Sequence, residues 1–313
     1  MPPRPLSTTR ERRLAEAGVL VVMAFWAANF IVVKAANEQI PPITFAFLRF
    51  GLAAVTLLAL LRWREGRLGL PRRDVVPILG LGALGFGIYQ ILWATALQDI
   101  PAGDSALLIA TTPVITALLA VVSRADSLTR TKLLGSLVSF AGVAVIVSAG
   151  HGLTLGSAVV GDILTLIAAV CWSIYTAFGA PILRRHSPLR TTAWAMVGGS
   201  LVLLGPGVLQ AVGLSWGTVR ADAWAGLLFS AFIPAGIANV VVFSAIRLLG
   251  PTRITAYQFL VPFMAVLMGA AFLSEPVRFD QLLGGFVIVL GVAISRTDRV
   301  TAFGGWLRER ATG

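Results

Sequence analysis

Long apolar runs recur along the whole chain, and arginines, prolines or glycines bound each of them. A helix needs about 20 mainly apolar residues to cross a bilayer, so each run predicts a membrane-spanning helix. Only 12% of the residues are charged, about half of what is usual for a soluble domain. We therefore expect an all-α polytopic membrane protein of ten transmembrane helices, near 15–36, 41–61, 75–97, 103–123, 131–149, 158–181, 190–211, 222–246, 252–273 and 278–295.

The basic residues predict how these helices are oriented. With ten helices, alternate loops place 21 of the 25 lysines and arginines on one side of the membrane, whereas Lys34, Arg220 and Arg278 fall on the other. The positive-inside rule makes the rich side cytoplasmic, so both tails, 1–13 and 297–313, are expected there. The net charge of +11 does not indicate nucleic-acid binding, because the arginines lie between apolar spans and not on one face of a soluble domain.

The chain contains an internal repeat. An offset of 149 positions aligns Pro113 with Pro262, Gln90 with Asn239, and the Leu-Leu-Gly at 133–135 with the one at 282–284. The repeats are predicted at 14–149 and 158–296, with five helices each. Because five is odd, the second repeat must enter the membrane from the opposite side. Inverted repeats are typical of transporters that work by alternating access, although a repeat can also be only a relic of gene duplication.

Four short stretches, taken in order, carry a resemblance to a known family. They are residues 25–30 with Lys34, Pro42 with 45–46 and Arg49, 106–108 with 112–113, and 274–276 followed by Gly284 and Gly291. With these stretches the chain resembles the EamA-like family of the drug/metabolite transporter superfamily, and within it the YddG-type amino-acid exporters. The resemblance implies ten helices, a central cavity lined by both halves, and fifth and tenth helices that support the bundle from outside. The chain departs from the family at Asp126, where many relatives have a Gly-Glu pair.

Polar and aromatic residues inside the predicted spans form the candidate substrate site. Three pairs are spaced i, i+3 and so share a helix face: Trp26 with Asn29, Gln90 with Trp93, and Trp172 with Tyr175. An amide in hydrocarbon is costly unless it is paired, so these faces are expected to meet a cavity or to bond other helices. The predicted substrate-binding residues are Trp26, Asn29, Tyr89, Gln90, Trp93, Trp172, Tyr175, Asn239, Tyr257 and Gln258.

Arg49 is the one clear charge well inside a predicted span. A charge at this depth is usually functional, so Arg49 is a candidate partner for a substrate carboxylate. The sequence leaves two alternatives open. Arg49 either pairs with Asp99, Asp104 or Asp162 near the outer face, or extends along the helix to the membrane surface.

Pro113 and Pro262 lie inside predicted helices at equivalent positions of the two repeats. Each lacks an N–H and so releases the carbonyl four residues earlier, at Ile109 and at Gln258. We interpret the two prolines as gating hinges, with a static kink as the alternative.

The sequence excludes several classes of function. The only histidines, His151 and His186, fall in predicted loops, and Cys171 has no partner for a disulfide or a metal site. We therefore expect no enzyme, metal or cofactor. A receptor or scaffold gives no reason for an inverted repeat, so it stays only as the lesser alternative to a transporter.

Amides, aromatic rings and one arginine suit a small zwitterion such as an aromatic or other neutral amino acid or a derivative. The alternative substrates are cationic or lipophilic drugs held by aromatic rings, whereas phosphorylated substrates need several cations. No carboxylate or histidine is expected at depth, so the sequence shows no proton relay. Facilitated export down a gradient and export coupled to an ion both stay open. The expected partners are the lipid bilayer and the small-molecule substrate. A bacterial cytoplasmic membrane is favoured over an organellar one, and a monomer over a dimer.

Overall fold

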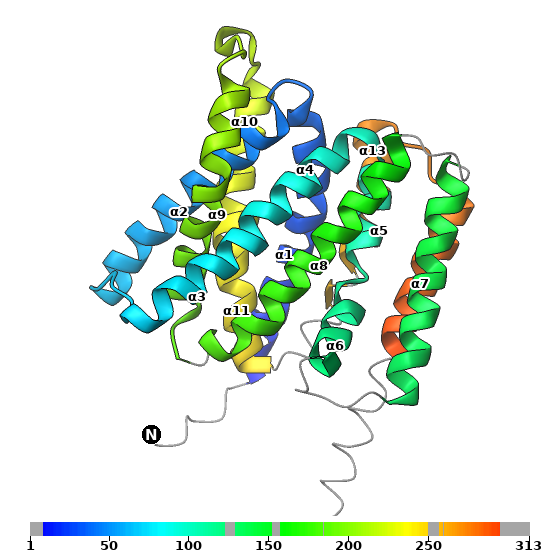
Figure 1. Ribbon diagram of the computed structural model, residues 1–313, viewed down its shortest axis with the longest axis horizontal. Coiled ribbons are helices and arrows are strands. Elements are labelled where there is room, and N and C mark those ends of the chain that lie inside the picture. Colours follow the sequence, from blue (N-terminus) through cyan, green and yellow to red (C-terminus); the bar gives the residue numbers. More distant parts are fainter. Residues whose placement is uncertain are drawn as a thin grey trace, which may run out of the picture.

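The computed structural model describes residues 9–122, 129–151, 157–183, 185–249, 257–258 and 260–294, and within these ranges the secondary structure is helical without strands (Figure 1). The tail at 297–313 and positions 1–8 lie outside them. The helices of the first half are α1 (Thr9–Asn37), α2 (Pro42–Glu65), α3 (Arg72–Gly82), η1 (Ala83–Ile88), α4 (Tyr89–Asp99), α5 (Ala102–Ile109), α6 (Thr112–Val122) and α7 (Arg130–His151). The second half has α8 (Ser157–Leu183), α9 (Pro188–Ala211), η2 (Trp216–Thr218), α10 (Ala221–Ser230), η3 (Ala231–Ile237), α11 (Ala238–Leu249), α13 (Leu260–Leu273) and a last helix over Phe279–Ile294.

Local sequence signals set several helix ends. Pro42 occupies the first turn of α2, where a missing N–H costs nothing, and Gly66 ends that helix with a φ of 68°. The Ser187 hydroxyl accepts a hydrogen bond from the backbone N–H of Arg190 and caps α9. Helix α1 begins at Thr9, so part of the segment assigned to the N-terminal tail is helical.

The helices are long and apolar enough for a membrane. Within the described ranges, six helical stretches meet the length and hydropathy needed to cross a bilayer: 13–37, 42–65, 72–99, 158–179, 188–211 and 221–242. Shorter apolar helices cover Leu133–Ile146, Leu260–Leu273 and Phe279–Ile294. The predicted helix near 103–123 is divided into α5 and α6 by a turn at Ala110–Thr111.

Two helices contain a wide π-helical segment at matching positions. Segment η1 joins α3 to α4, and segment η3 joins α10 to α11. Each segment is followed within two residues by a buried amide, Gln90 after η1 and Asn239 after η3. Single-turn π segments in α-helices are often found at functional sites. The two π-helical segments therefore indicate a candidate functional site between these helices.

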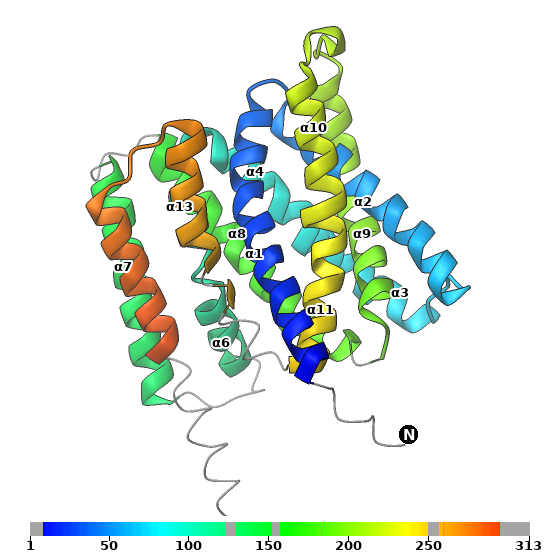
Figure 2. The same ribbon diagram turned by 180° about the vertical axis from the view of Figure 1, so that it is seen from behind.

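Helix α7 and the last helix form a pair at one edge of the molecule, as both views show (Figures 1 and 2). Glycines bring them together: a Cβ on Gly142 would lie 2.6 Å from the carbonyl oxygen of Gly284, and a Cβ on Gly291 would lie 2.5 Å from that of Gly135. The pairing of 142 with 284 and of 135 with 291 makes the two helices antiparallel. Small residues permit this close approach.

Candidate functional site

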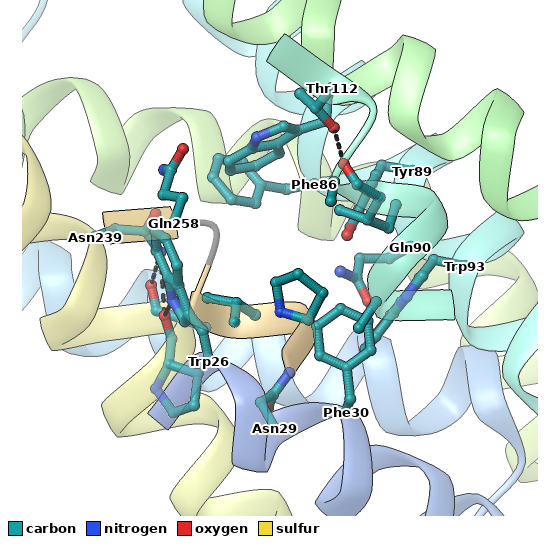
Figure 3. A pocket seen from close by; sticks show the side chains of 18 of the residues that line it. Trp26, Asn29, Phe30, Phe86, Tyr89, Gln90, Trp93, Thr112, Asn239 and Gln258 are labelled. Carbon is teal, nitrogen blue, oxygen red and sulfur yellow. Dashed lines mark hydrogen bonds between the residues drawn. The ribbon is translucent and has the colours of Figure 1, made fainter. Parts of the chain in front are cut away.

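A cavity of about 170 Å³ lies in the middle of the bundle. An apolar cavity of this size holds a group about as large as benzene. Figure 3 shows labelled side chains around it, with Gln90 and Asn239 on opposite sides of the central space. The lining comes from both halves of the chain: Trp26, Asn29, Phe30, Arg49, Phe50, Phe86, Tyr89, Gln90, Trp93, Ala106, Ile109, Ala110, Thr112, Pro113, Trp172, Pro234, Ala235, Asn239, Gln258, Val261 and Pro262.

The three buried amides of the lining are held in different ways. Asn29 Oδ1 accepts a hydrogen bond from the Ser230 hydroxyl at 2.6 Å. Asn239 Nδ2 donates to the carbonyls of Pro234 and Ala235, which belong to η3, at 3.2 and 2.8 Å. Gln90 Oε1 is buried and has no hydrogen-bond partner among the described residues. Gln90 is thus an acceptor available to a bound molecule.

Aromatic rings form the wall around Gln90. Tyr89 and Trp93 stack with their ring centroids 6.2 Å apart, and Trp172 lies 5.7 Å from Tyr89 and from Phe86. Trp93 is fixed further because its indole Nε1 donates to the Ser105 hydroxyl at 3.1 Å. Aromatic faces of this kind suit an apolar or aromatic group of a ligand.

Arg49 contributes a positive charge to the same lining. Its side chain is 6% exposed, and Nε and Nη1 are buried without a hydrogen-bond partner among the described residues. The guanidinium carbon lies 4.7 Å from the centroid of the Phe50 ring, which gives some compensation. The burial contradicts an extended Arg49 that reaches the membrane surface, and no ion pair joins it to the carboxylates of Asp99, Asp104 or Asp162.

The predicted hinge prolines both line the cavity. Pro113 follows the break between α5 and α6, and the carbonyl of Ile109 accepts a hydrogen bond from the Thr112 hydroxyl at 2.6 Å. The carbonyl released by Pro113 is therefore bonded locally. Pro262 lies in the first turn of α13, next to residues outside the described ranges.

Two predicted site residues lie outside this lining. Tyr175 is buried, and its ring packs 5.0 Å from that of Phe86 and against Gly85 of η1. Tyr257 packs against a hydrophobic cluster that α1 and α11 form and that includes Val19 and Val242. The sequence predicted that Tyr175 and Tyr257 bind substrate, but in the structure both side chains pack into neighbouring hydrophobic clusters.

Sequence reasoning missed several lining residues, namely Phe30, Phe50, Phe86, Thr112 and Pro234. Phe30 follows Asn29, Phe50 follows Arg49 and Thr112 precedes Pro113, so adjacency to a polar or proline position was a usable signal. Phe86 and Pro234 lie inside the π-helical segments, which the regular helical period does not describe.

Charged groups gather at the outer end of the bundle, by which we mean the end that carries Lys34 and Arg278. Lys34 Nζ lies 2.8 Å from Glu275 Oε1, and both oxygens of Glu275 accept from the backbone N–H of Ala102. Asp104 is 1% exposed and accepts from Arg278 Nη2 at 3.2 Å and from Gln281 Nε2 at 2.7 Å. These bonds tie α1 and α5 of the first half to the segment before the last helix and to the first turn of that helix.

Arg278 remains charged in this cluster. Partial burial acts to lower its pKa, but the carboxylates of Asp104 and Asp280 outweigh that effect and raise the pKa above its ordinary value. Asp104 and Asp162 are both almost fully buried, and each lies within the first two turns of its helix. The expectation that no carboxylate lies in the middle of a span therefore stays a prediction. Sequence reasoning placed Asp162 near the outer surface.

Apolar helices of membrane-spanning length around a central cavity define a multi-pass membrane protein. A solved crystal structure has the same fold, with a TM-score of 0.64 and 17% sequence identity over 91% of this chain and 97% of that one. The chain belongs to the EamA-like transporter family, whose model matches residues 13–148 and 159–297.

Curated relatives cover most of the chain. A probable terminal-alkyne amino-acid exporter of Streptantibioticus cattleyicolor is 32% identical over 88% of this chain and 91% of its own length. A probable amino-acid metabolite efflux pump of Salmonella typhimurium is 28% identical over 90% and 97%. The uncharacterized transporter YyaM of Bacillus subtilis is 26% identical over 86% and 88%. The names of the family and of its relatives indicate transport and not catalysis.

Proposed function

We propose that this chain exports neutral amino acids, aromatic ones included, and their derivatives, by alternating access of two inverted repeats. The observation that carries the proposal is the buried Arg49, whose Nε and Nη1 have no hydrogen-bond partner among the described residues. The rest of the cavity lining consists of aromatic, aliphatic and proline residues, one threonine and four amides. A guanidinium without a partner binds a carboxylate through charge-assisted hydrogen bonds. The rings accept the side chain of the amino acid, and the free Gln90 oxygen accepts a hydrogen bond from its ammonium group.

The transporter that we propose has ten spans, both termini in the cytoplasm and a bacterial cytoplasmic membrane as its location. Three features support the inverted repeats: the paired π-helical segments, the matched amides after them, and the antiparallel contact of α7 with the last helix. The same contact supports a monomer, because it uses these glycines within one chain. Two relatives named for amino-acid substrates support the substrate class.

Arg49 also separates this proposal from the export of cationic drugs. A buried positive charge repels a cation, and none of the described residues that line the cavity is acidic. A zwitterion presents an anionic group to Arg49 and an apolar group to the rings. The cavity thus favours amino acids over organic cations.

The test is counterflow of labelled phenylalanine and leucine in proteoliposomes. We expect Arg49→Gln to raise the apparent Kd for both amino acids about tenfold or more, because one charge-assisted interaction is lost. Phenethylamine, which has the ring and the amine but no carboxylate, serves as the matched substrate, and its weak binding should not weaken further. Unchanged amino-acid transport by Arg49→Gln would contradict the role of Arg49, and absence of counterflow in the wild type would contradict the amino-acid substrate.

A further inference from the structure

Asp162 in α8 is a buried carboxyl group, and one of its oxygens has no hydrogen-bond donor among the described residues. Asp162 is 2% exposed, and its Oδ1 atom is buried without a hydrogen-bond partner among the described residues. The cavity described above does not include it. A buried charge of this kind is costly unless it is paired, or neutralised by a bound proton or cation.

The charged surroundings of Asp162 are predominantly acidic. From α5 comes Asp104, and from α4 comes Asp99, whose Cβ would lie 3.4 Å from a Cβ on Gly161. Arg278, which holds Asp104 and Asp280, is the nearby cation. Lys34, which pairs with Glu275, donates a hydrogen bond to the backbone carbonyl of Ile100. His151 is the last residue of α7, and its side chain is outside the described set.

This arrangement suits a proton better than a metal cation. A hard cation such as Ca²⁺ or Mg²⁺ requires about six oxygen ligands. The two oxygens of Asp104 are already bonded to Arg278 and Gln281. A proton requires only one carboxylate oxygen, and it removes one negative charge from the cluster.

Asp162 is connected to the cavity through α5 and α8. Ser105, next to Asp104, holds the indole of Trp93, and Trp172 in α8 lines the same cavity. The bond from Arg278 to Asp104 joins the two halves of the chain at the outer end. When Asp162 is protonated, it no longer repels Asp104 or competes with it for Arg278, so the ion pair of Arg278 with Asp104 is strengthened.

We propose that Asp162 is a proton-binding site that couples amino-acid export to proton entry. In each cycle the carboxylate takes up one proton at the outer side and forms the neutral acid. It releases that proton inside, while one zwitterion leaves in the other direction. One positive charge therefore enters per amino acid. The inference rests on the proposed amino-acid export and adds its energy source.

The test measures accumulation of labelled phenylalanine in proteoliposomes that are acidic inside, with the membrane potential clamped. For one proton exchanged per amino acid, a gradient of one pH unit gives an accumulation ratio of about ten. We expect this ratio for the wild type and a ratio near one for Asp162→Asn. Asp162→Ala, which removes the buried polar group, is the second variant and should also be uncoupled.

Asp222→Asn is the matched control, because Asp222 is an exposed carboxylate at the same end of the bundle. It should keep the tenfold ratio. A wild-type ratio of one, a ratio that follows a sodium gradient, or full coupling in Asp162→Asn or Asp162→Ala would each overturn the proposal. Exchange of amino acid without any gradient separates the two claims: if exchange itself is absent, the proposed substrate is wrong, and if only coupling is absent, the role of Asp162 is wrong.

Discussion

At the scale of single residues, Trp93 links the cavity to the core. It is 2% exposed, its ring meets Phe30 edge to face at 5.1 Å, and its Nε1 bonds Ser105. A tryptophan can be buried this deeply because the indole N–H has found an acceptor. One side of the ring can therefore face the cavity while the polar edge stays satisfied.

We expect the Trp93–Ser105 hydrogen bond to contribute about 0.6 kcal/mol, the average for hydrogen bonds between helices in membranes. The measurement is a double-mutant cycle with Trp93→Phe and Ser105→Ala, read as the free energy of unfolding in mixed micelles. Ser244→Ala is the control, since that exposed hydroxyl bonds only Val240 of its own helix. A coupling energy of zero would show that the bond does not hold the cavity wall.

At the scale of helices, glycines decide which pairs come closest. In the contact between α7 and the last helix, Gly142 and Gly284 each approach the backbone of the other. Among the described residues, none from either helix lines the cavity. This pair is therefore a support for the bundle, and its stability is expected to be separable from substrate binding.

Gly142→Ala should lower the free energy of unfolding by about 1–3 kcal/mol, because the new methyl group overlaps the backbone of the last helix. Gly80→Ala in α3 is the control: no atom lies within 4 Å of a Cβ there, so stability should stay the same or rise by up to about 1 kcal/mol. Thermal unfolding of the purified protein measures both variants. Equal stability of the two would contradict the close contact.

At the scale of the whole molecule, the proposed inverted repeat predicts which side of the membrane each loop faces. Gly69 follows α2 and Gly217 follows α9, so the two glycines occupy corresponding loops of the two repeats. Both have open space around them. If the repeats are inverted, these loops must lie on opposite sides of the membrane.

In a Cys171→Ala background, we expect an impermeant maleimide to label Gly217→Cys in intact spheroplasts and Gly69→Cys only after permeabilisation. The wild-type protein, whose one thiol at Cys171 is buried, should not react and serves as the unlabelled control. Labelling of both engineered positions from the same side would rule out inverted repeats. Labelling with the two sides exchanged would instead reverse the predicted orientation.

Helix existence and the repeat were readable from the sequence, because a span is recognised from a local run of apolar residues and a repeat from a fixed offset. Eight of the ten residues predicted to bind substrate lie in the cavity lining for a related reason. An i, i+3 pair such as Trp26 with Asn29 shares a helix face in any packing, and an amide on that face must meet protein or a cavity.

What the sequence determined is therefore local: apolar spans, breaks at prolines and glycines, the offset between the halves and the family. The tertiary structure decided which neighbour each helix face meets. It separated Tyr89, which lines the cavity, from Tyr175, which packs into the core, and it buried Asp162 while leaving Arg49 unpaired. The physical reason is that helical periodicity fixes which side chains share a face, whereas burial and pairing depend on contacts between residues far apart in the chain.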